Sequence, residues 1–456
     1  MLETAEVKDG ATPCFVVRPN VTTAQRGTRD ADSDLAEAVG LAGAINLQIV
    51  HAEVINLARP HPSAFLGKGS INRLRQMVSS FIEQENKYAI VIMDCTLSPV
   101  QQRNLERHLN CKVIDRTGLI LEIFGERAAT AEGRLQVELA HLKWQKSRLV
   151  RSWTHLERQR GGFGFLGGPG ETQIEADRRM IQERITKIER QLETVKRTRQ
   201  LHRKTRRDAP YPVVALVGYT NAGKSTLFNR LTEAGVFAEN LLFATLDPTM
   251  RGLMLPSGRK IILSDTVGFI SDLPTHLVAA FRATLEEVLE AEVILHVRDA
   301  AHEETEIQKR DVEDVLASLG VTKESAEENE QHVVDVLNKI DLLEGEAHDA
   351  AVNLSVREPL TVAVSALTGE GTQELLALID RLIVDEERHV HFDLPSNEGE
   401  AIAWLHANAH VRKREDGEDG IVHLDIGLTP LVAGRFEKRF PDLSRRLGEA
   451  AAHAAE

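Results

Sequence analysis

Gly218-Tyr219-Thr220-Asn221-Ala222-Gly223-Lys224-Ser225 is the stretch that decides the fold. Its spacing is that of the G-x-x-x-x-G-K-[ST] phosphate loop. An apolar run at 213–217 precedes it and a helical pattern follows it, which is the strand–loop–helix order in which this motif holds phosphates. Backbone N–H groups at the helix N-terminus surround the phosphates, Lys224 adds positive charge, and the Ser225 hydroxyl is a candidate Mg²⁺ ligand. The stretch therefore predicts a nucleoside triphosphate site without identifying the base.

The composition indicates a soluble globular protein of about three domains, at roughly 100–200 residues each. The chain has 456 residues, of which 42% are hydrophobic and 27% charged, and a net charge of −14. No apolar run approaches the roughly 18 residues of a membrane helix, and residues 1–10 do not resemble a signal peptide. Cys14, Cys95 and Cys111 lack metal-type spacing. We therefore expect a cytoplasmic protein without stable membrane insertion, with its cysteines reduced and buried.

A basic segment lies within this acidic chain. Residues 128–210 contain 19 Lys and Arg residues against 10 Asp and Glu residues, a net charge of +9, which leaves −23 for the remainder. Apolar residues in steps of three and four, over 135–156 and 181–195, predict two packed helices. Residues 161–170 between them hold six glycines and one proline, a composition that ends a helix. The pattern predicts an antiparallel helical hairpin with a glycine-rich tip and a basic far end, which includes Lys196, Arg197, Arg203 and Arg207.

The remaining patterns divide the chain into units and give an α/β fold class. Residues 1–127 alternate short strands and helices, which predicts a small α/β unit with a mostly parallel sheet. Residues 128–210 are the hairpin, and residues 211–386 predict a doubly wound sheet, the fold of a P-loop GTPase. Residues 387–456 follow a β-α-β-β-α order, typical of a small α+β unit. The strands expected in the doubly wound sheet are 213–217, 253–255, 260–265, 293–297, 333–338 and 360–365.

Asn338-Lys339-Ile340-Asp341 indicates which base is bound. It ends an apolar strand, where the Asp341 carboxylate can accept hydrogen bonds from N1–H and the exocyclic amine of guanine. Adenine lacks that donor pair and would leave the carboxylate unpaired, which costs several kcal/mol. The aliphatic part of Lys339 would flank the base. Ser365-Ala366-Leu367 follows another strand and would support the base with a main-chain N–H.

Asp265-Thr266-Val267-Gly268 has the D-x-x-G pattern and ends the strand at 260–264. Asp265 would hold Mg²⁺ through water, and the Gly268 N–H would meet the γ-phosphate. Phe243-Ala244-Thr245-Leu246-Asp247 lies between the phosphate loop and that strand, where a γ-phosphate sensor belongs. We expect Thr245 to be the second hydroxyl ligand of Mg²⁺, with Thr249 as its rival. In this order and strand context, the motifs together predict a GTPase.

Phe269 follows the D-x-x-G glycine, where Ras-type enzymes place the glutamine that orients the attacking water. A phenylalanine has no group for that role, so no catalytic residue is assigned. We therefore expect slow intrinsic hydrolysis that a bound partner accelerates.

Several stretches resemble the HflX family of translation-associated GTPases. The resemblance covers roughly residues 40–385 and rests on three stretches. They are Arg116-Thr117-Gly118-Leu119-Ile120-Leu121-Glu122-Ile123-Phe124, the glycine-rich tip with the following Glu171-Thr172-Gln173, and residues 243–249. Arg298 departs from the family pattern, since an apolar residue is common there.

The resemblance implies a GTPase that acts on the large ribosomal subunit and separates stalled or idle ribosomes, often under heat stress. The basic hairpin would enter the RNA-rich interior of the subunit, and we expect a monomer away from the ribosome. Positive charge suits phosphate contacts, glycines allow close approach to RNA, and phenylalanines can stack on unpaired bases. The expected RNA-binding residues at the tip are Gly161, Gly162, Phe163, Gly164, Phe165, Gly167 and Gly168.

Three alternatives remain open from the sequence. The chain could be an RNA-remodelling ATPase, in which case ATP would compete with GTP at Lys224. It could be a GTP-gated protein scaffold, in which case salt-dependent RNA or ribosome binding would be absent. Residues 67–70, Gly-Lys-Gly-Ser, superficially resemble a phosphate loop, so a second nucleotide site for ATP near the N-terminus is also considered.

Overall fold

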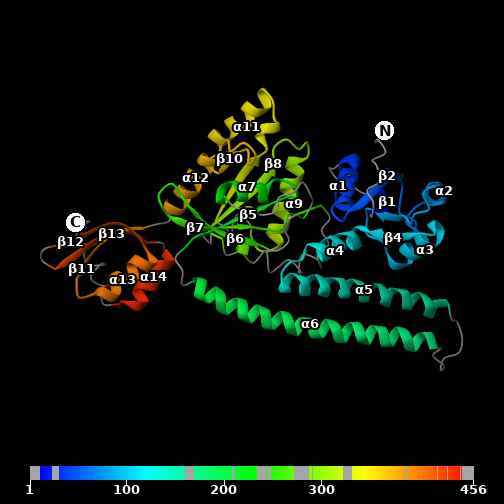
Figure 1. Cartoon of the computed structure of the whole chain (residues 1–456), viewed down its shortest axis with the longest axis horizontal. Helices are drawn as coiled ribbons and strands as arrows, with labels where there is room; N and C mark the ends of the chain where they lie inside the picture. The colour runs from blue at the N-terminus through cyan, green and yellow to red at the C-terminus, as the bar shows by residue number, and fades with distance from the viewer. Residues whose placement is uncertain are drawn as a thin grey trace.

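A computed structural model shows three β-sheets and a long helical hairpin (Figure 1). No helix among the residues that it describes is both long enough and apolar enough to cross a membrane. The described residues are 11–22, 30–159, 169–207, 211–233, 243, 248–271, 287–289, 291–321, 331–385, 388–417, 420–428, 430–441 and 443.

The first sheet has four parallel strands in the order β2-β1-β3-β4, as the alternating pattern predicts. Alternate residues of its inner strand β1 belong to different hydrophobic clusters. Val16 lies in one cluster, and Phe15 and Val17 lie in the other, so both faces of the sheet are covered. The sequence patterns did not predict β1 or α1. The elements are β1 (Thr12–Val21), α1 (Ala31–Gly43), β2 (Leu47–Leu57), α2 (Lys68–Glu85), β3 (Ile90–Met93), α3 (Pro99–Leu109), β4 (Lys112–Asp115) and α4 (Arg116–Arg127).

Local signals explain where two of these helices begin. Ser98 caps α3 in a capping box with Gln101, and Pro99 occupies the first turn, where a missing N–H costs nothing. The Asp115 carboxylate caps α4 by accepting a hydrogen bond from the Gly118 N–H at 2.9 Å. By contrast, α2 does not directly follow a strand, because β2 ends at Leu57. A phosphate loop requires that strand, so the fold does not support a second phosphate loop at residues 67–70.

The hairpin consists of α5 (Ala131–Gln159) and α6 (Pro169–Arg207), which lie side by side (Figure 1). Ile185 and Ile188 of the predicted seam are buried. Exposed ion pairs also join the helices, including Lys143–Glu189 at 2.9 Å. At 1.5 Å per residue, the 39 residues of α6 span about 58 Å.

The central sheet has the order β10-β9-β8-β5-β7-β6, with only β6 antiparallel to its neighbour. This is the predicted doubly wound sheet, and the four strands that precede site residues, β5, β7, β9 and β10, all run parallel. Their carboxyl ends therefore meet at one edge. The elements are β5 (Val213–Gly218), α7 (Lys224–Thr232), β6 (Thr249–Met254), β7 (Lys260–Asp265), β8 (Val293–Asp299), α9 (Thr305–Ser318), β9 (His332–Asn338), the 3₁₀ helix η1 (Ile340–Leu342), α11 (Glu346–Arg357), β10 (Thr361–Ala363) and α12 (Thr372–Asp385).

The third sheet is antiparallel, with the order β11-β13-β12, and matches the predicted β-α-β-β-α order. One face packs on α13 and α14 through Phe392, Leu424 and Phe436. The elements are β11 (Arg388–Pro395), α13 (Gly399–Asn408), β12 (His410–Asp416), β13 (Ile421–Leu428) and α14 (Pro430–Arg439).

Candidate guanine-nucleotide site

The phosphate loop joins β5 to α7 and requires glycine at both ends. Gly218 has φ 149°, and a Cβ there would lie 2.1 Å from the carbonyl oxygen of Val297. Gly223 has φ 91°, and a Cβ there would lie 2.1 Å from Nδ2 of Asn338. Any larger side chain would push the loop away from β8 or from β9, so both glycines are needed for close approach as well as for positive φ.

Lys224 lies buried inside the loop. Its ammonium donates hydrogen bonds to the carbonyl oxygens of Gly218, at 3.1 Å, and Tyr219, at 2.7 Å. Burial lowers the pKa of Lys224 to about 8, while the nearby Asp265 carboxylate acts in the opposite direction. The loop thus holds a cation whose charge is only partly compensated, ready for an anionic ligand.

The two candidate metal ligands at the loop lie together. Ser225 Oγ donates a hydrogen bond to Oδ2 of the fully buried Asp265 at 2.7 Å. A hydroxyl and a carboxylate beside a phosphate loop are the oxygen donors that Mg²⁺ prefers, so this pair fits the ion. Thr249, the rival to Thr245, begins β6 directly opposite Asp265.

The other D-x-x-G residues fill space or support the backbone. Thr266 donates its hydroxyl to the carbonyl oxygen of Leu216 at 2.6 Å, and Val267 is buried in the core. A Cβ on Gly268 would lie 2.9 Å from the Lys224 ammonium and from Thr220, so only glycine brings this backbone so close to the loop. Of these three residues, Gly268 alone is placed to meet a ligand at Lys224.

Asn338 connects the motifs. Its side-chain amide donates to the carbonyl oxygen of Ala222 in the phosphate loop at 2.8 Å and accepts from the Ala366 N–H at 3.0 Å. It is almost fully buried, so both bonds are shielded from water. The Ala366 N–H is therefore used to fix Asn338, while the expectation that this turn supports the base with a main-chain N–H stays a prediction.

Asp341 and Lys339 lie just beyond the end of β9. Ser365 Oγ donates to Oδ1 of Asp341 at 2.6 Å, which fixes the carboxylate, and Lys339 Nζ pairs with Asp299 at 2.7 Å. The Ile340 side chain between them is buried. Leu367 is largely exposed. The structure therefore brings Asp341, Lys339 and Ser365 together, although β9 and β10 are separated by the whole of α11.

Phe269 cannot orient water, because its side chain is 1% exposed within the core. Its backbone instead pairs with the phosphate loop: its N–H donates to the Gly218 carbonyl at 3.1 Å, and its carbonyl accepts from the Thr220 N–H at 2.7 Å. The backbone of Phe269 thus links the D-x-x-G segment to the phosphate loop.

Some expected site residues lie elsewhere or outside the described residues. The Phe243 ring is buried and packs at 82° on Phe124 of α4, 4.7 Å between centroids, in a hydrophobic cluster that also includes Tyr219. Arg197 is exposed on α6 and lies 3.9 Å from Glu193. Ala244, Thr245, Leu246, Asp247, the tip residues from Gly161 to Gly168, and the side chains of Lys196, Arg203 and Arg207 lie outside the described residues.

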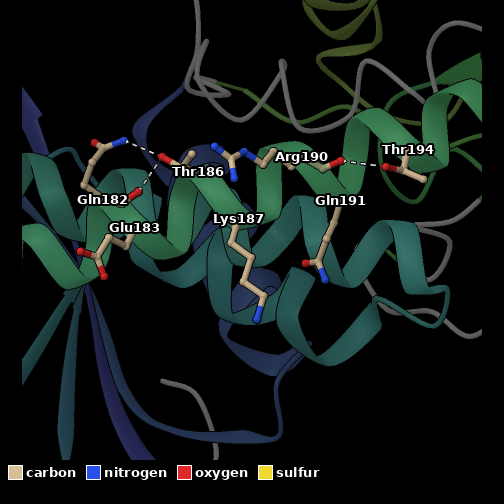
Figure 2. A pocket seen from close by; sticks show the side chains of 7 residues that line it. All are labelled: Gln182, Glu183, Thr186, Lys187, Arg190, Gln191 and Thr194. Carbon is tan, nitrogen blue, oxygen red and sulfur yellow. Dashed lines mark hydrogen bonds between the residues drawn. The ribbon is translucent and has the colours of Figure 1, made fainter.

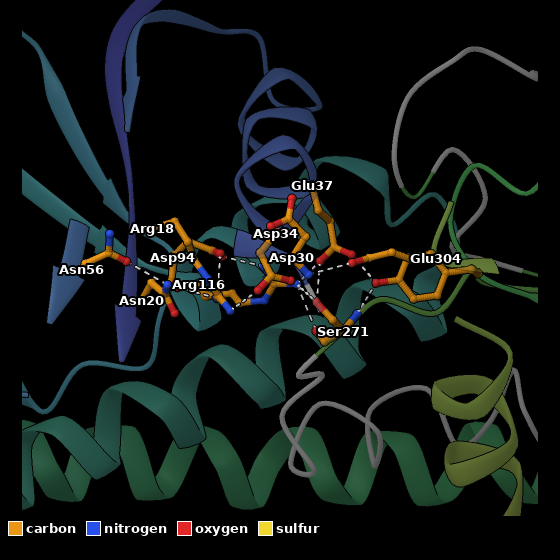
Figure 3. A network of polar contacts seen from close by, with 11 residues as sticks. Arg18, Asn20, Asp30, Asp34, Glu37, Asn56, Asp94, Arg116, Ser271 and Glu304 are labelled. Atoms are coloured by element: carbon orange, nitrogen blue, oxygen red, sulfur yellow. Dashed lines mark hydrogen bonds and ion pairs between the residues drawn. The ribbon is translucent and has the colours of Figure 1, made fainter. Parts of the chain in front are cut away.

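A buried polar network, which the sequence patterns did not predict, joins the site to α1 and α4 of the first unit (Figure 3). The Tyr219 hydroxyl donates to the Glu37 carboxylate and accepts from the Ser271 N–H at 2.7 Å. Ser271 Oγ also donates to Glu37, at 2.7 Å. Burial opposes ionisation of Glu37, but the adjacent Arg116 cation and these hydrogen bonds hold its pKa below the usual range. The Tyr219 side chain therefore contacts Glu37 of the first unit and does not point into the phosphate loop.

Arg116 is the centre of this network. It pairs with Glu37 and with Asp94, the latter at 2.5 Å, and donates to the Ser271 carbonyl at 3.0 Å. Arg18 continues the chain of charges to Asp94 at 2.9 Å. An arginine at the start of α4, three residues before the apolar run Leu119–Leu121 begins, is the sequence signal that points to a buried ion pair.

Two further arginines have structural roles near the site. Arg298 pairs with Glu306 and with Asp335, the latter at 3.4 Å, so its charge is compensated within the fold. Arg230 of α7 donates to the Ala366 carbonyl at 3.1 Å and to the Leu367 carbonyl, and so supports the turn that holds Asp341.

Comparison with known proteins identifies the family. The chain is 48% identical over 440 residues to the GTPase HflX of Magnetococcus marinus, covering 96% of both proteins. It is a member of the HflX family of GTPases. The Escherichia coli HflX is 43% identical over 418 residues, covering 91% of this chain and 95% of that protein. The putative GTP-binding protein 6 of Xenopus laevis is 33% identical, covering 96% of this chain and 81% of that protein.

Family models divide this HflX chain in the same order as its folded units. They are described as GTP-binding GTPase N-terminal (residues 32–125), GTP-binding GTPase Middle Region (127–206), 50S ribosome-binding GTPase (213–339) and HflX C-terminal domain (351–456). The resemblance of the sequence to HflX is thereby confirmed. This HflX protein binds guanine nucleotide and hydrolyses GTP.

The lowered pKa of Lys224 predicts proton uptake when nucleotide binds. Below pH 8 the lysine of the free protein is already charged. Bound phosphate favours the ammonium and raises its pKa, so above pH 8 binding must take up a proton and affinity falls as pH rises. We expect GDP titrations by calorimetry, in two buffers of different ionisation enthalpy, to show about half a proton taken up at pH 8 and less at pH 7. Equal enthalpies in both buffers at pH 8 would contradict the assignment.

Proposed function

We propose that this HflX protein is a GTP-driven switch that binds the large ribosomal subunit and separates stalled or idle ribosomes, notably under heat or other stress. The observation that carries the proposal is the hairpin of α5 and α6 (Figure 1). These two long helices belong to a segment of net charge +9 within a chain whose net charge is −14. The match of residues 213–339 to a family described as a 50S ribosome-binding GTPase supports the same partner.

Exposed cations of α6 would supply the phosphate contacts. Arg178, Arg179, Lys187 and Arg190 are all exposed, and Figure 2 shows Lys187 and Arg190 among the side chains on this stretch of α6. Each RNA phosphate neutralised releases counterions, so binding should weaken as salt rises. The glycine-rich tip, residues 161–168, would approach RNA most closely.

Guanine selection is assigned to Asp341. Its carboxylate would accept the two guanine donors while Ser365 fixes one of its oxygens, and the aliphatic part of Lys339 would flank the base. The phosphates would occupy the loop from Gly218 to Ser225, with Lys224 on the outer phosphates. Gly268 would provide its N–H to the γ-phosphate.

Mg²⁺ is proposed as the cofactor, held by Ser225 directly and by Asp265 through water. The second hydroxyl ligand would come from Thr245, or from Thr249 at the start of β6. When bound, the ion neutralises charge on the phosphates of GTP. Asp265 is positioned for this by its burial and by its place at the end of β7.

Slow intrinsic hydrolysis is proposed because Phe269 is confined to the core and offers no group to the attacking water. The ribosome would accelerate hydrolysis by ordering the segments that precede β6 and follow β7. Single-turnover assays should therefore show slow GTP cleavage by the protein alone and faster cleavage with large subunits. Equally fast cleavage without ribosomes would contradict this point.

The test of the function is sedimentation with purified ribosomal subunits under GTP, GDP and a non-hydrolysable GTP analogue. We expect co-sedimentation with large subunits under the analogue and release under GDP. The double variant Arg178→Glu/Arg190→Glu should weaken binding and reduce its salt dependence. The matched control Arg75→Glu/Arg107→Glu changes net charge equally on the exposed surface of α2 and α3 and should bind normally. Binding that ignores the nucleotide would reject the switch.

The alternative functions have distinct outcomes in the same experiments. An RNA-remodelling ATPase would let ATP compete with GTP at Lys224, and RNA unwinding would survive Asp341→Asn. A protein scaffold timed by GTP would show no salt-dependent binding to ribosomes or RNA. The exposed cations on α6 favour the ribosomal function over the scaffold.

We also propose four units, 1–127, 128–210, 211–386 and 387–456. The placement of β10 in the central sheet supports a last boundary beyond β10, although the family model for the C-terminal domain begins at residue 351. Buried residues of the first unit and of the central unit share one hydrophobic cluster, which includes Phe124 and Val217. The first sheet and the central sheet would therefore move as one body.

A further inference from the structure

The outer face of the third sheet carries a compact group of imidazoles and carboxylates. Alternate residues of β11 and β13 pack inward, as Phe392 and Leu424 do. Side chains between them point outward, and the pairing of β11 with β13 places Asp393 directly opposite His423, two residues from His391. This arrangement follows from the two-residue period of a strand, which brings positions i and i+2 to one face.

Three potential ligand atoms of this face lie close together. Asp393 Oδ1 lies 2.5 Å from Nδ1 of His423 and 3.2 Å from Nε2 of His391. All three atoms fall within 4.8 Å of one another. The two imidazole rings stack with centroids 6.1 Å apart and planes 16° from parallel, so both edges face the same carboxylate. His391 and Asp393 of β11 and His423 of β13 thus direct their polar atoms toward one point.

We propose that His391, Asp393 and His423 form a site for a divalent transition-metal ion such as Zn²⁺, which no activity of the GTPase domain requires. Two imidazoles and one carboxylate are a donor set that suits zinc and its neighbours, and not Mg²⁺, which prefers oxygen. Zn²⁺ with ligands at about 2.0–2.1 Å separates neighbouring ligand atoms by about 3.3 Å in tetrahedral geometry. The His391–Asp393 spacing already fits that value.

Binding requires one local change. The 2.5 Å contact between His423 and Asp393 is a hydrogen bond, which the ion would replace by two bonds to itself as the atoms separate by about 0.8 Å. All three side chains are at least one-third exposed, so this rotation needs no backbone movement. Water or Glu415, which lies opposite His423 on β12, would complete the coordination.

The site would fasten one strand to another. His391 and Asp393 belong to β11 and His423 to β13, so a bound ion crosslinks two adjacent strands of the sheet. An ion that binds only the folded sheet stabilises it in proportion to its concentration above the dissociation constant. The expected consequence is a metal-dependent melting temperature of the third sheet, independent of GTP.

The test is calorimetric titration of the tag-free, chelator-treated full chain with ZnCl₂ and, separately, MgCl₂. We expect one zinc site that His391→Ala or His423→Ala weakens about tenfold or more, and no site of that kind for Mg²⁺. The control His406→Ala removes an exposed imidazole of the same domain, on α13, and should leave the zinc titration unchanged. Co²⁺ should give the absorption of a low-symmetry site in the wild type and lose it in either histidine variant.

Asp393→Asn keeps the size of the side chain and should also weaken zinc binding, while melting of the chelated variants shows that they fold. A zinc titration unchanged in both histidine variants would overturn the site and leave the three residues as an ordinary ion pair. Unchanged melting of the wild type with saturating zinc would reject the crosslink. Nucleotide binding should be unaffected in every case, so failure here does not touch the GTPase function.

Discussion

Asp341→Asn should lower the affinity for GDP by about 100-fold or more and shift preference toward xanthosine diphosphate. The wild-type carboxylate accepts from two guanine donors, and loss of charged hydrogen bonds in a partly buried site costs about 2–5 kcal/mol. An asparagine amide can donate to the 2-oxo group of xanthine while still accepting from N1–H. Because Ser365 Oγ fixes Asp341 at 2.6 Å, Ser365→Ala should also weaken GDP binding, by about tenfold.

The measurement is a fluorescence titration with GDP and xanthosine diphosphate for each variant. Asp349→Asn is the matched control, since this carboxylate lies exposed on α11 of the same unit. It should leave both affinities unchanged. If Asp341→Asn binds GDP as the wild type does, Asp341 does not read the base.

Arg116→Met should lower the free energy of unfolding by about 3–5 kcal/mol, because it leaves the buried Glu37 carboxylate without its cation and leaves Asp94 with Arg18 alone. Arg116 is 3% exposed, and its partners Asp94 and Glu37 lie in the same buried network. The matched control is Arg73→Met. Its ion pair with Glu53 has a 57% exposed arginine, so this variant should cost less than about 1 kcal/mol.

Urea unfolding followed by circular dichroism measures both variants, using the transition that includes the first sheet, since several units need not melt together. In a double-mutant cycle, Arg116→Met and Glu37→Gln should together cost less than the sum of the two, because they share one contact. Equal destabilisation by Arg116→Met and Arg73→Met would show that the network contributes little.

The nucleotide motifs could be predicted because their chemistry is local. A phosphate loop needs glycine, lysine and a hydroxyl at fixed spacing, and a turn between strand and helix brings them together whatever the distant chain does. The order of strands that end in Asp265 and Asn338 likewise follows from parallel crossover connections. The structure places Asp265 at the end of β7 and Asn338 at the end of β9, while their ligands remain proposals.

Strand β1 and the network around Arg116 were missed for the opposite reason. Residues 12–21 mix Pro13, Arg18, Pro19 and Asn20 with apolar side chains, so the local pattern of a buried strand is interrupted. Arg18 is tolerated there only because Asp34 and Asp94 approach from other elements. Propensity does not record such partners.

The sequence alone predicted the triphosphate loop and the guanine motif, because each depends on spacing within one short segment. It also predicted the mostly parallel sheets and the basic hairpin, because strand and helix patterns alternate regularly along the chain. Only the tertiary structure decided that Asn338 connects three motifs, that Phe269 is held in the core, and that Tyr219 reaches Glu37 on α1 of the first unit. Those roles depend on burial and on partners that are distant in the sequence, 116 residues apart for Asn338 and Ala222 and 182 for Tyr219 and Glu37. In these cases the role of a side chain depends on the residues that the fold places next to it.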